Sequence, residues 1–578
     1  MAALTWRGWT DPFVDYGAAV ETARQLAQGR VLYRDVAALH GALAPELLAG
    51  LFRVCGAHVM TAAAAGLALA AGVTALVFAL ARRAAGTFAG AAAGLAFVLV
   101  FAFAQVTPAN TYNWICPYVP DVTLGAALAL LALFALDRAG GPSGSVRAFF
   151  AAGLATGLCF LTKAEVFAAL AGGTAVFFAA LPRGRRTGRA LAAWAAGTAL
   201  PPAAIFLLYA FRGGAALGWR AVQGPWPAVL DRRIAALPFF AGVSGFDDAR
   251  GNLLRLALWS VCLAGLAGFG AGAAFLAARG RGRLAGALVV AALAALATTL
   301  RSPLWLEAPR ALPAASAVLL ALAWHAPASE VRPLRVALAA LALGLLGKVL
   351  LHAQVAHYGF ALAMPAALLT VAAISGPLPE AVGVRGADPR FARAFGAGLA
   401  ALFALACAAR TAAWARAKTE TAGAGADLFR GDGRTAALRA ALQEIENMAP
   451  KDATLAVLPE GALANFLTRR SNPTPYLALM PVEEIAYTPA RVAAAYRAAP
   501  PDFVLLVHKD TAEFGAPAFG RDYARELGDF LAEAYEPVAL LGAEPFTSAQ
   551  FGLKLLRRRT DPPTDPAWRG TVQRPEPR

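Results

Sequence analysis

The sequence predicts a mainly α-helical protein: a polytopic transmembrane helical bundle with a C-terminal α/β domain outside the membrane. Two observations predict this fold class. Hydrophobic residues make up 58% of the 578 residues and charged residues only 15%, and the mean hydropathy is +0.55. The apolar residues also form about twelve stretches, each about as long as a bilayer is thick.

These stretches define a predicted membrane domain, residues 58–412. They cover residues 58–81, 86–104, 119–136, 146–162, 164–182, 190–211, 254–278, 284–300, 310–326, 334–351, 357–375 and 391–412. Arginine clusters occupy alternate loops, at 82–83, 138–147, 183–189, 279–283, 332–335 and 385–393. Because loops rich in Lys and Arg face the cytoplasm, the opening segment and the region after residue 413 are expected on the opposite, outer side.

The net charge of +16 follows largely from these loop arginines. Nucleic-acid binding is not expected, since no soluble stretch combines basic and aromatic residues in one surface. The five cysteines have no metal-type spacing. Cys55 and Cys116 both lie toward the outer side, where either a disulfide or two unpaired thiols would fit, and we favour the thiols.

Residues 1–57 form a polar outer segment with surface helices. Asp11 and Asp15 precede a predicted helix over 16–28, which ends at Gly29, a residue suited to the left-handed end of a helix. Nothing ahead of this segment resembles a signal peptide. We therefore expect either a further N-terminal helix beyond this chain or translocation of the short N-terminus by the first apolar stretch.

A second short helix is predicted over residues 45–54. Four residues give it an apolar face: Leu47, Leu48, Leu51 and Phe52. At about ten residues it is too short to cross a bilayer, which needs about 20. It is expected to lie along the membrane surface.

Two charged residues, Lys163 and Glu165, interrupt an apolar run over residues 149–181 that is long enough for two spans. A charge at mid-bilayer costs about 2.5–3.5 kcal/mol on insertion scales. The sequence TKAE is therefore predicted to form a turn at the outer surface. The two charges either solvate that turn or take part in function.

Residues 413–560 are predicted to form a small α/β domain on the outer face. Short apolar strands (454–458, 503–507, 538–541 and 552–556) alternate with predicted helices (434–447, 489–498 and 522–534). This region contains no recognisable catalytic motif. Residues 561–578 are proline-rich and predicted to be disordered.

Two acidic residues stand at the outer ends of apolar stretches. Asp15 lies in the opening segment, and Asp121 heads the stretch that begins PYVPDVTL. A carboxylate so near hydrocarbon is costly and is usually functional or paired. The alternative for Asp121 is a helix cap after Pro120, where the helix dipole also favours a negative charge.

The order of several motifs resembles the GT-C superfamily of membrane glycosyltransferases, in particular the branch with the aminoarabinose and protein O-mannosyl transferases, glycosyltransferase family 39. An aspartate and a surface helix are followed by GRVLYRD, a small-residue bend and a second helix. PDVTLGAALALL is similar to the family's second acidic loop, GLCFLTKAE to its T-K turn, and HYGFALAMPAALL to an aromatic segment before a late span. The chain departs from the pattern at Tyr16, where an acid commonly follows the aspartate, and at Ala42, where a proline is usual.

The resemblance implies transfer of a sugar from a polyprenyl-phosphate donor to a lipid, glycan or protein acceptor on the periplasmic face of a bacterial inner membrane. It implies that Asp15 is the general base and that Asp121 positions the acceptor or helps to hold a divalent metal. The remaining candidate substrate-binding residues, several of them able to stabilise a phosphate, are Asp11, Arg30, Tyr33, Arg34, Lys163, Glu165, Arg301, Arg310, His357 and Tyr358.

Three other functions stay open from the sequence. A transporter or lipid flippase would place ionisable residues near mid-bilayer, whereas here the charges gather at the outer ends of the stretches. A polymerase or ligase for lipid-linked glycans would use arginines of a large outer loop, as Arg220, Arg232 and Arg233 could provide. The third alternative is a structural membrane protein whose site is degenerate.

Overall fold

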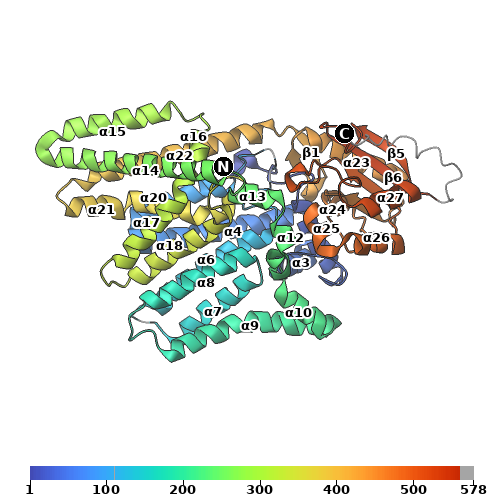
Figure 1. Cartoon of the computed structure of the whole chain (residues 1–578), viewed down its shortest axis with the longest axis horizontal. Helices are drawn as coiled ribbons and strands as arrows, with labels where there is room; N and C mark the ends of the chain where they lie inside the picture. Colours follow the sequence, from blue (N-terminus) through green and yellow to red (C-terminus); the bar gives the residue numbers. More distant parts are fainter. Residues whose placement is uncertain (108, 110, 143, 560–578) are drawn as a thin grey trace.

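The computed structural model describes residues 1–107, 109, 111–142 and 144–559. Long helices form a bundle at one end of the molecule, and the C-terminal sheet with its helices forms the other end (Figure 1). The helix α3 of the opening segment lies where these two parts meet. The tail that the sequence predicts to be disordered, 561–578, lies outside the described residues.

The opening segment forms three helices: α1 (Ala2–Thr5), α2 (Tyr16–Ala27) and α3 (Leu43–Cys55). The end of α2 agrees with the expectation, because Gly29 adopts a φ of +98°. In α3, Leu48 and Phe52 are buried, whereas Leu47 and Leu51 are exposed. One apolar side of α3 therefore packs on the protein and another is left uncovered, as the predicted surface helix requires.

All the predicted apolar stretches lie in helices. These are α4 (Val59–Ala85), α5 (Thr87–Ala96) with η1 (Phe97–Ala102), α6 (Pro120–Ala139), α7 (Val146–Phe160), α8 (Ala164–Ala180), α9 (Gly188–Gly213), α14 (Ala249–Leu276), α15 (Gly282–Ala297), α17 (Leu312–His325), α18 (Arg332–Leu346), α20 (Met364–Ser375) and α22 (Pro389–Ala417).

Among the described residues, 7 helical stretches are long and apolar enough to cross a membrane, and three shorter apolar helices accompany them. One of the seven, Pro238–Ala297, contains both α14 and α15, which are separated by a non-helical turn (η2, Ala277–Arg281) at Arg279 and Gly280. The helices therefore support a mainly helical membrane bundle, while the expected twelve crossings remain a prediction.

Small residues let neighbouring helices of the bundle approach closely. An added Cβ at Gly153 of α7 would lie 2.1 Å from the carbonyl oxygen of Trp194 in α9, and one at Gly157 would lie 2.3 Å from that of Thr198. Such close backbone contact is typical of packed membrane helices.

Shorter helices lie between the long helices in the sequence. They are α10 (Ala215–Gln223), α11 (Trp226–Leu230), α12 (Arg232–Ala235), α13 (Pro238–Ser244), α16 (Leu304–Glu307), η3 (Ala308–Ala311), η4 (Gly347–Val349), α19 (Gly359–Leu362) and α21 (Pro377–Val384). Of these, α12 contacts α25 (Pro481–Tyr487) and α13 contacts η6 (Ala512–Phe514) of the C-terminal part.

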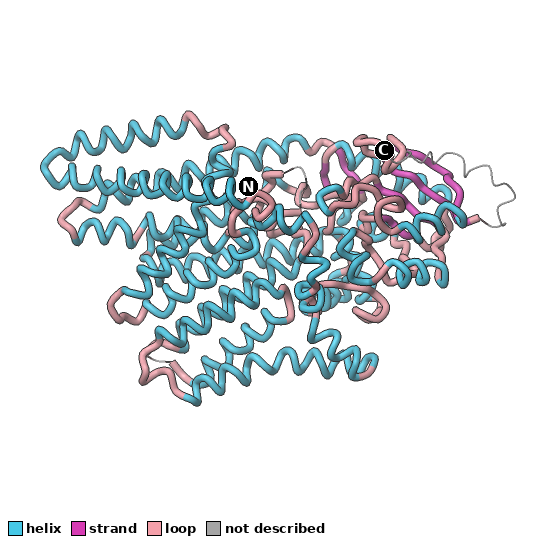
Figure 2. The backbone as a smooth tube through the Cα atoms, viewed as in Figure 1, coloured by secondary structure: helices cyan, strands magenta, loops and turns pink. Residues whose placement is uncertain are grey.

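The C-terminal part contains a four-stranded mixed sheet with the order β3-β4-β6-β5 (Figure 2). Its strands are β3 (Leu455–Leu458), β4 (Phe503–Val507), β5 (Tyr535–Gly542) and β6 (Gly552–Arg558). β3 and β4 are parallel, with Val457 opposite Leu505, and the other pairs are antiparallel. All four strands were predicted.

The helices around this sheet are α23 (Gly433–Met448), α24 (Leu463–Thr468), α25 (Pro481–Tyr487), α26 (Pro489–Ala498), α27 (Arg525–Ala534), η5 (Gly425–Asp427) and η6 (Ala512–Phe514). A small antiparallel hairpin, β1 (Glu420–Ala422) with β2 (Phe429–Gly431), joins α22 to the domain. This hairpin, α24 and α25 were not predicted.

Candidate active site

A cavity of about 110 Å³ lies where the opening segment, the start of α6 and the C-terminal domain meet. Four acidic side chains from these three parts line it: Asp15, Asp121, Glu460 and Glu483. The sequence analysis singled out the first two. A small pocket with several ionisable groups is a natural candidate for an active site.

Asp15 directly precedes α2 and has an unusual backbone conformation, with φ +54° and ψ −61°. Its N–H donates a hydrogen bond of 2.7 Å to Oε1 of Glu460. Non-glycine residues rarely adopt such a conformation, and strained residues of this kind gather at functional sites. Asp15 is half-buried and lines the cavity.

The charges around Asp15 act in opposite directions. Burial and the negative charges of Glu460 and Glu483 raise the pKa of the Asp15 carboxyl, whereas Lys509 and Lys163 lower it, and the net effect places it well above 3.8. Nζ of Lys509 lies 2.8 Å from Oε2 of Glu460. Burial also raises the pKa of Glu483, to about 7. The cavity can therefore hold protons near neutral pH.

Asp121 is the second residue of α6, so its carboxylate sits in the first turn, where the helix dipole favours a negative charge. Its exposed fraction is 1%, and its Oδ1 has no hydrogen-bond partner among the described residues. The N-cap position is occupied by Val119, without a side-chain capping hydrogen bond. The capping interpretation thus explains the position of Asp121 but not its unpartnered oxygen in the cavity wall.

Two lysines and a glutamate lie beside the cavity. Lys163 lies in the predicted turn between α7 and α8, and its Nζ is 5.8 Å from the centre of the Tyr118 ring. Nζ of Lys348, just after α18, lies 2.8 Å from Oε1 of Glu165 and 4.6 Å from the centre of the Tyr358 ring. The TKAE turn is thus paired with a second cation that the sequence analysis did not identify.

Aromatic rings surround these cations. His357 lies 4.2 Å from Tyr358 and 4.6 Å from Tyr112 between ring centres, and Tyr118 lies 5.3 Å from Tyr358. Phe239 of α13 contacts His357 and stacks on Phe514 of the C-terminal domain at 4.6 Å. Tyr118 also lines the cavity of Asp15, so this aromatic cluster adjoins the cavity.

Four candidates of the opening segment, Asp11, Arg30, Tyr33 and Arg34, make contacts outside the cavity. Asp11 accepts hydrogen bonds from the N–H groups of Phe13 and Val14 and lies 2.7 Å from Arg434. Arg30 donates to Gln25 and to the carbonyl oxygen of Asn472, and Arg34 pairs with Asp35.

Tyr33 donates a hydrogen bond to the carbonyl oxygen of His40, and the guanidinium group of Arg220 lies over its ring. None of these four side chains lines the cavity of Asp15, although His40 does.

The two arginine candidates of the later helices also lie apart from the cavity lining. Arg301 is exposed after the end of α15. Arg310 is buried in η3, where it pairs with Glu307 and donates to Oδ1 of Asn252 in α14. Its guanidinium group therefore joins two helices of the bundle.

A divalent metal finds no ready set of ligands in the described part of the chain, where no group of three or more His, Cys, Asp or Glu side chains is arranged to hold one. Of the acids in the cavity, Glu460 is paired with Lys509 and bonded to the backbone of Asp15. The five cysteines are unpaired, and Cys55 is exposed whereas Cys116 is buried.

The sequence analysis missed Glu460, Glu483, Lys509 and Lys348. Lys348 could have been found, because a lone charge within an apolar stretch is a functional signal. Glu460 carried no such signal, since it lies in a short turn and its contact with Asp15 spans 445 residues of sequence.

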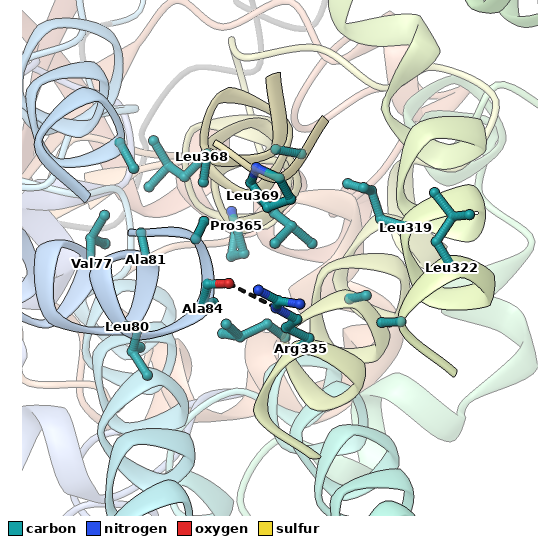
Figure 3. Close-up of a pocket in the computed structure, with 18 of the residues that line it drawn as sticks. Val77, Leu80, Ala81, Ala84, Leu319, Leu322, Arg335, Pro365, Leu368 and Leu369 are labelled. Atoms are coloured by element: carbon teal, nitrogen blue, oxygen red, sulfur yellow. Dashed lines mark hydrogen bonds between the residues drawn. The ribbon is translucent and has the colours of Figure 1, made fainter. Parts of the chain in front are cut away.

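A second cavity of about 350 Å³ lies within the helical bundle (Figure 3). Its lining is apolar except for Arg335, whose Nε donates a hydrogen bond of 2.7 Å to the carbonyl oxygen of Ala84. Without acids or nucleophiles, this groove offers no chemistry comparable to that around Asp15.

No protein-family model matches the chain, and no curated protein matches it. Among solved structures, the chain is similar to ArnT from Cupriavidus metallidurans bound to undecaprenyl phosphate, with 16% identity, 96% of each chain covered and a TM-score of 0.44. The apo state of the same protein gives 15% identity, 96% coverage of each chain and a TM-score of 0.42.

The Archaeoglobus fulgidus oligosaccharyltransferase in complex with zinc and sulfate is similar at 12% identity, over 94% of this chain and 70% of that chain, with a TM-score of 0.48. At these identities and TM-scores the similarities are distant, and they assign neither an activity nor a residue role to this chain.

Proposed function

We propose that the chain is a membrane glycosyltransferase that moves a sugar from a polyprenyl-phosphate donor to an acceptor hydroxyl at the outer face of the membrane. One observation carries the proposal. A strained, half-buried aspartate lines a cavity that also contains the buried Asp121, one of whose oxygens has no hydrogen-bond partner among the described residues. Two lysines and an aromatic cluster lie alongside.

Asp15 acts as the general base. Its ionised carboxylate takes the proton of the acceptor hydroxyl while the acceptor oxygen forms a bond to the anomeric carbon of the sugar. The bond from that carbon to the phosphate oxygen breaks, and its electron pair leaves with the lipid phosphate. Because the pKa of Asp15 is raised, transfer should become faster as the pH rises through the range in which this carboxyl ionises.

Lys163 and Lys348 stabilise the departing phosphate. Cations fixed in a water-poor site stabilise developing negative charge strongly. Their ammonium groups lie near the rings of Tyr118 and Tyr358, and Lys348 is also paired with Glu165. Asp121 orients the acceptor through its free oxygen.

The proposed location is the periplasmic side of a bacterial inner membrane, from the arginine distribution. Cys55 is exposed and offers a test. In a Cys262→Ser background, a membrane-impermeant maleimide should label Cys55 in intact spheroplasts. With Cys55→Ser added, Arg186→Cys, in a loop proposed to be cytoplasmic, should react only after permeabilisation. Labelling of the two sites in the reverse order would contradict this orientation.

Release of polyprenyl phosphate tests the activity itself. Proteoliposomes would be supplied with radiolabelled undecaprenyl-phosphate mannose, glucose and arabinose, since undecaprenyl phosphate is the lipid bound in the ArnT structure. Release by the natural chain but not by Asp15→Asn would support the donor class and the base together. No release from any donor, with the protein folded, would favour a transporter, and this alternative predicts movement of intact lipid between leaflets.

A further inference from the structure

The acid that contacts Asp15 comes from the C-terminal domain. Glu460 follows β3 and Lys509 follows β4, and these two strands are parallel neighbours. The carboxyl ends of parallel strands meet at one edge of a sheet, so the two side chains are brought together there. Oε1 of Glu460 accepts the N–H of Asp15 at 2.7 Å, and Oε2 lies 2.8 Å from Nζ of Lys509.

We propose that Glu460 and Lys509 form a positioning pair that holds the backbone of Asp15 and balances its charge, which makes the C-terminal domain part of the catalytic site. The proposal rests on the role of Asp15 proposed above. It gives the sheet domain, in which the sequence shows no catalytic motif, a direct part in the reaction.

The pair of Glu460 and Lys509 is not needed to attach the C-terminal domain to the rest of the chain. Arg434 of α23 pairs with Asp11 at 2.7 Å, and Asp427 accepts the N–H of Val59 at 2.9 Å. The domain is therefore already joined to the opening segment and to α4. A buried ion pair is weak evidence for stability, because desolvation offsets most of the attraction, and Glu460 is 5% exposed.

The pair also faces the strained part of Asp15. A φ of +54° persists only where the surroundings fix it. The hydrogen bond to Glu460 engages the N–H of that same residue, directly ahead of the first turn of α2. Loss of the acceptor should therefore let the backbone of Asp15 relax and move its carboxyl group in the cavity.

The charged groups around Asp15 allow a test based on the direction in which each of them shifts the pKa of Asp15. Glu460 and Glu483 make its ionisation harder, Lys509 and Lys163 make it easier, and Asp121 of α6 lines the same cavity. Tyr112 and Tyr358 also face it. Removing the negative charge of Glu460 should lower the pKa of Asp15, and removing the positive charge of Lys509 should raise it.

Three variants separate charge from geometry. Glu460→Gln keeps an oxygen acceptor but loses the charge, so the acid limb of the pH profile for polyprenyl-phosphate release should move down by about one pH unit. Lys509→Met should move the same limb up. Glu460→Ala also loses the acceptor, so release should fall about tenfold or more and amide hydrogen exchange should rise in peptides covering residues 15–17.

The control is a second Lys and Glu pair of the same sheet domain. Nζ of Lys554 lies 2.6 Å from Oε1 of Glu544, away from the cavity lining. Glu544→Gln and Lys554→Met should leave the pH profile and the exchange of residues 15–17 unchanged. An effect as large as that of the Glu460 and Lys509 variants would mean that any charge change in the domain perturbs the site.

Two outcomes would overturn the positioning pair while leaving the proposed function in place. In the first, the pH profiles of Glu460→Gln and Lys509→Met shift in the same direction. In the second, the natural chain releases polyprenyl phosphate but neither variant shifts the pH profile. If the natural chain releases nothing, the proposed function fails by itself. Hydrogen exchange then still decides whether Glu460 holds Asp15, and unchanged exchange in Glu460→Ala would refute that contact.

Discussion

Lys348 and Glu165 form an ion pair of 2.8 Å that joins the end of α18 to the first turn of α8 beside the candidate active site. The pair lies next to Lys163, which belongs to the same turn as Glu165. The acids Asp121 and Asp15 also act on Lys163. A lipid phosphate would meet two lysine ammonium groups here, of which Lys348 already has Glu165 as its partner.

Replacing Lys348 tests this arrangement. Lys348→Met removes a cation beside the proposed phosphate position and leaves the negative charge of Glu165 without its partner. We therefore expect the KM for the polyprenyl-phosphate donor to rise about tenfold, equivalent to about 1.4 kcal/mol. Lys348→Arg keeps a cation and should retain most of the affinity. Steady-state release assays across donor concentrations measure both. An unchanged KM in the Met variant would remove Lys348 from donor binding.

Asp15→Asn should reduce transfer by about 10²- to 10⁴-fold, because the amide cannot accept the proton of the acceptor. The backbone N–H that bonds to Glu460 is preserved. Thermal unfolding and donor binding should therefore stay close to those of the natural chain. Asp121→Asn serves as the comparison, and there we expect a higher KM for the acceptor with a smaller loss of kcat. Equal loss in both variants would argue against separate roles.

The helices were predictable from the sequence because their signals are local. Apolar stretches of bilayer length and breaks at Gly29 or at the TKAE turn are visible within a few tens of residues, and the four strands of the C-terminal sheet also agree. The β1–β2 hairpin escaped because its strands have only three residues each, too few for a periodic pattern.

The site was predictable only in part, for the same reason. Asp15, Asp121 and Lys163 could be singled out because each is a charge next to an apolar stretch. Glu460 and Lys509 lie in turns of a soluble domain, where charged residues are ordinary. They reach the site only because the domain folds onto the opening segment. The hydrogen bond between Asp15 and Glu460 joins residues 445 positions apart, and no local pattern in a single sequence predicts such a contact.

Asp11 gives a prediction on stability. Burial alone would raise the pKa of the Asp11 carboxyl, but Arg434 and the N–H groups of Phe13 and Val14 outweigh it and hold this pKa below 3.8. A depressed pKa contributes stability above the unfolded-state value and loses it as the pH falls through the folded-state value. Asp11→Ala should cost about 1–3 kcal/mol near neutral pH, because the N–H groups of Phe13 and Val14 lose their acceptor, whereas Arg434 keeps Asp432 at 2.8 Å.

Thermal unfolding in detergent at several pH values would measure this effect. The difference between Asp11→Ala and the natural chain should be constant at neutral pH and shrink below about pH 4. Asp388→Ala is a suitable control, since Asp388 pairs with the exposed Arg390 at a helix start. A difference that stays the same at low pH would contradict the charge origin of the stabilisation.

Gly41 controls the position of the turn that carries Lys163. An added Cβ at Gly41 would lie 2.1 Å from the carbonyl oxygen of Leu161 and 2.5 Å from that of Thr162, so a methyl group cannot fit without moving this backbone. Gly41→Ala should therefore displace Lys163 and lower the rate of polyprenyl-phosphate release at least tenfold.

Gly50→Ala is the matched control, because an added Cβ at that position in α3 meets nothing within 4 Å. It should leave release unchanged and stabilise α3 slightly, since alanine favours a helix by about 1 kcal/mol over glycine. Normal release in Gly41→Ala would mean that the turn can shift without loss, and that Lys163 does not need its present position to act on the donor.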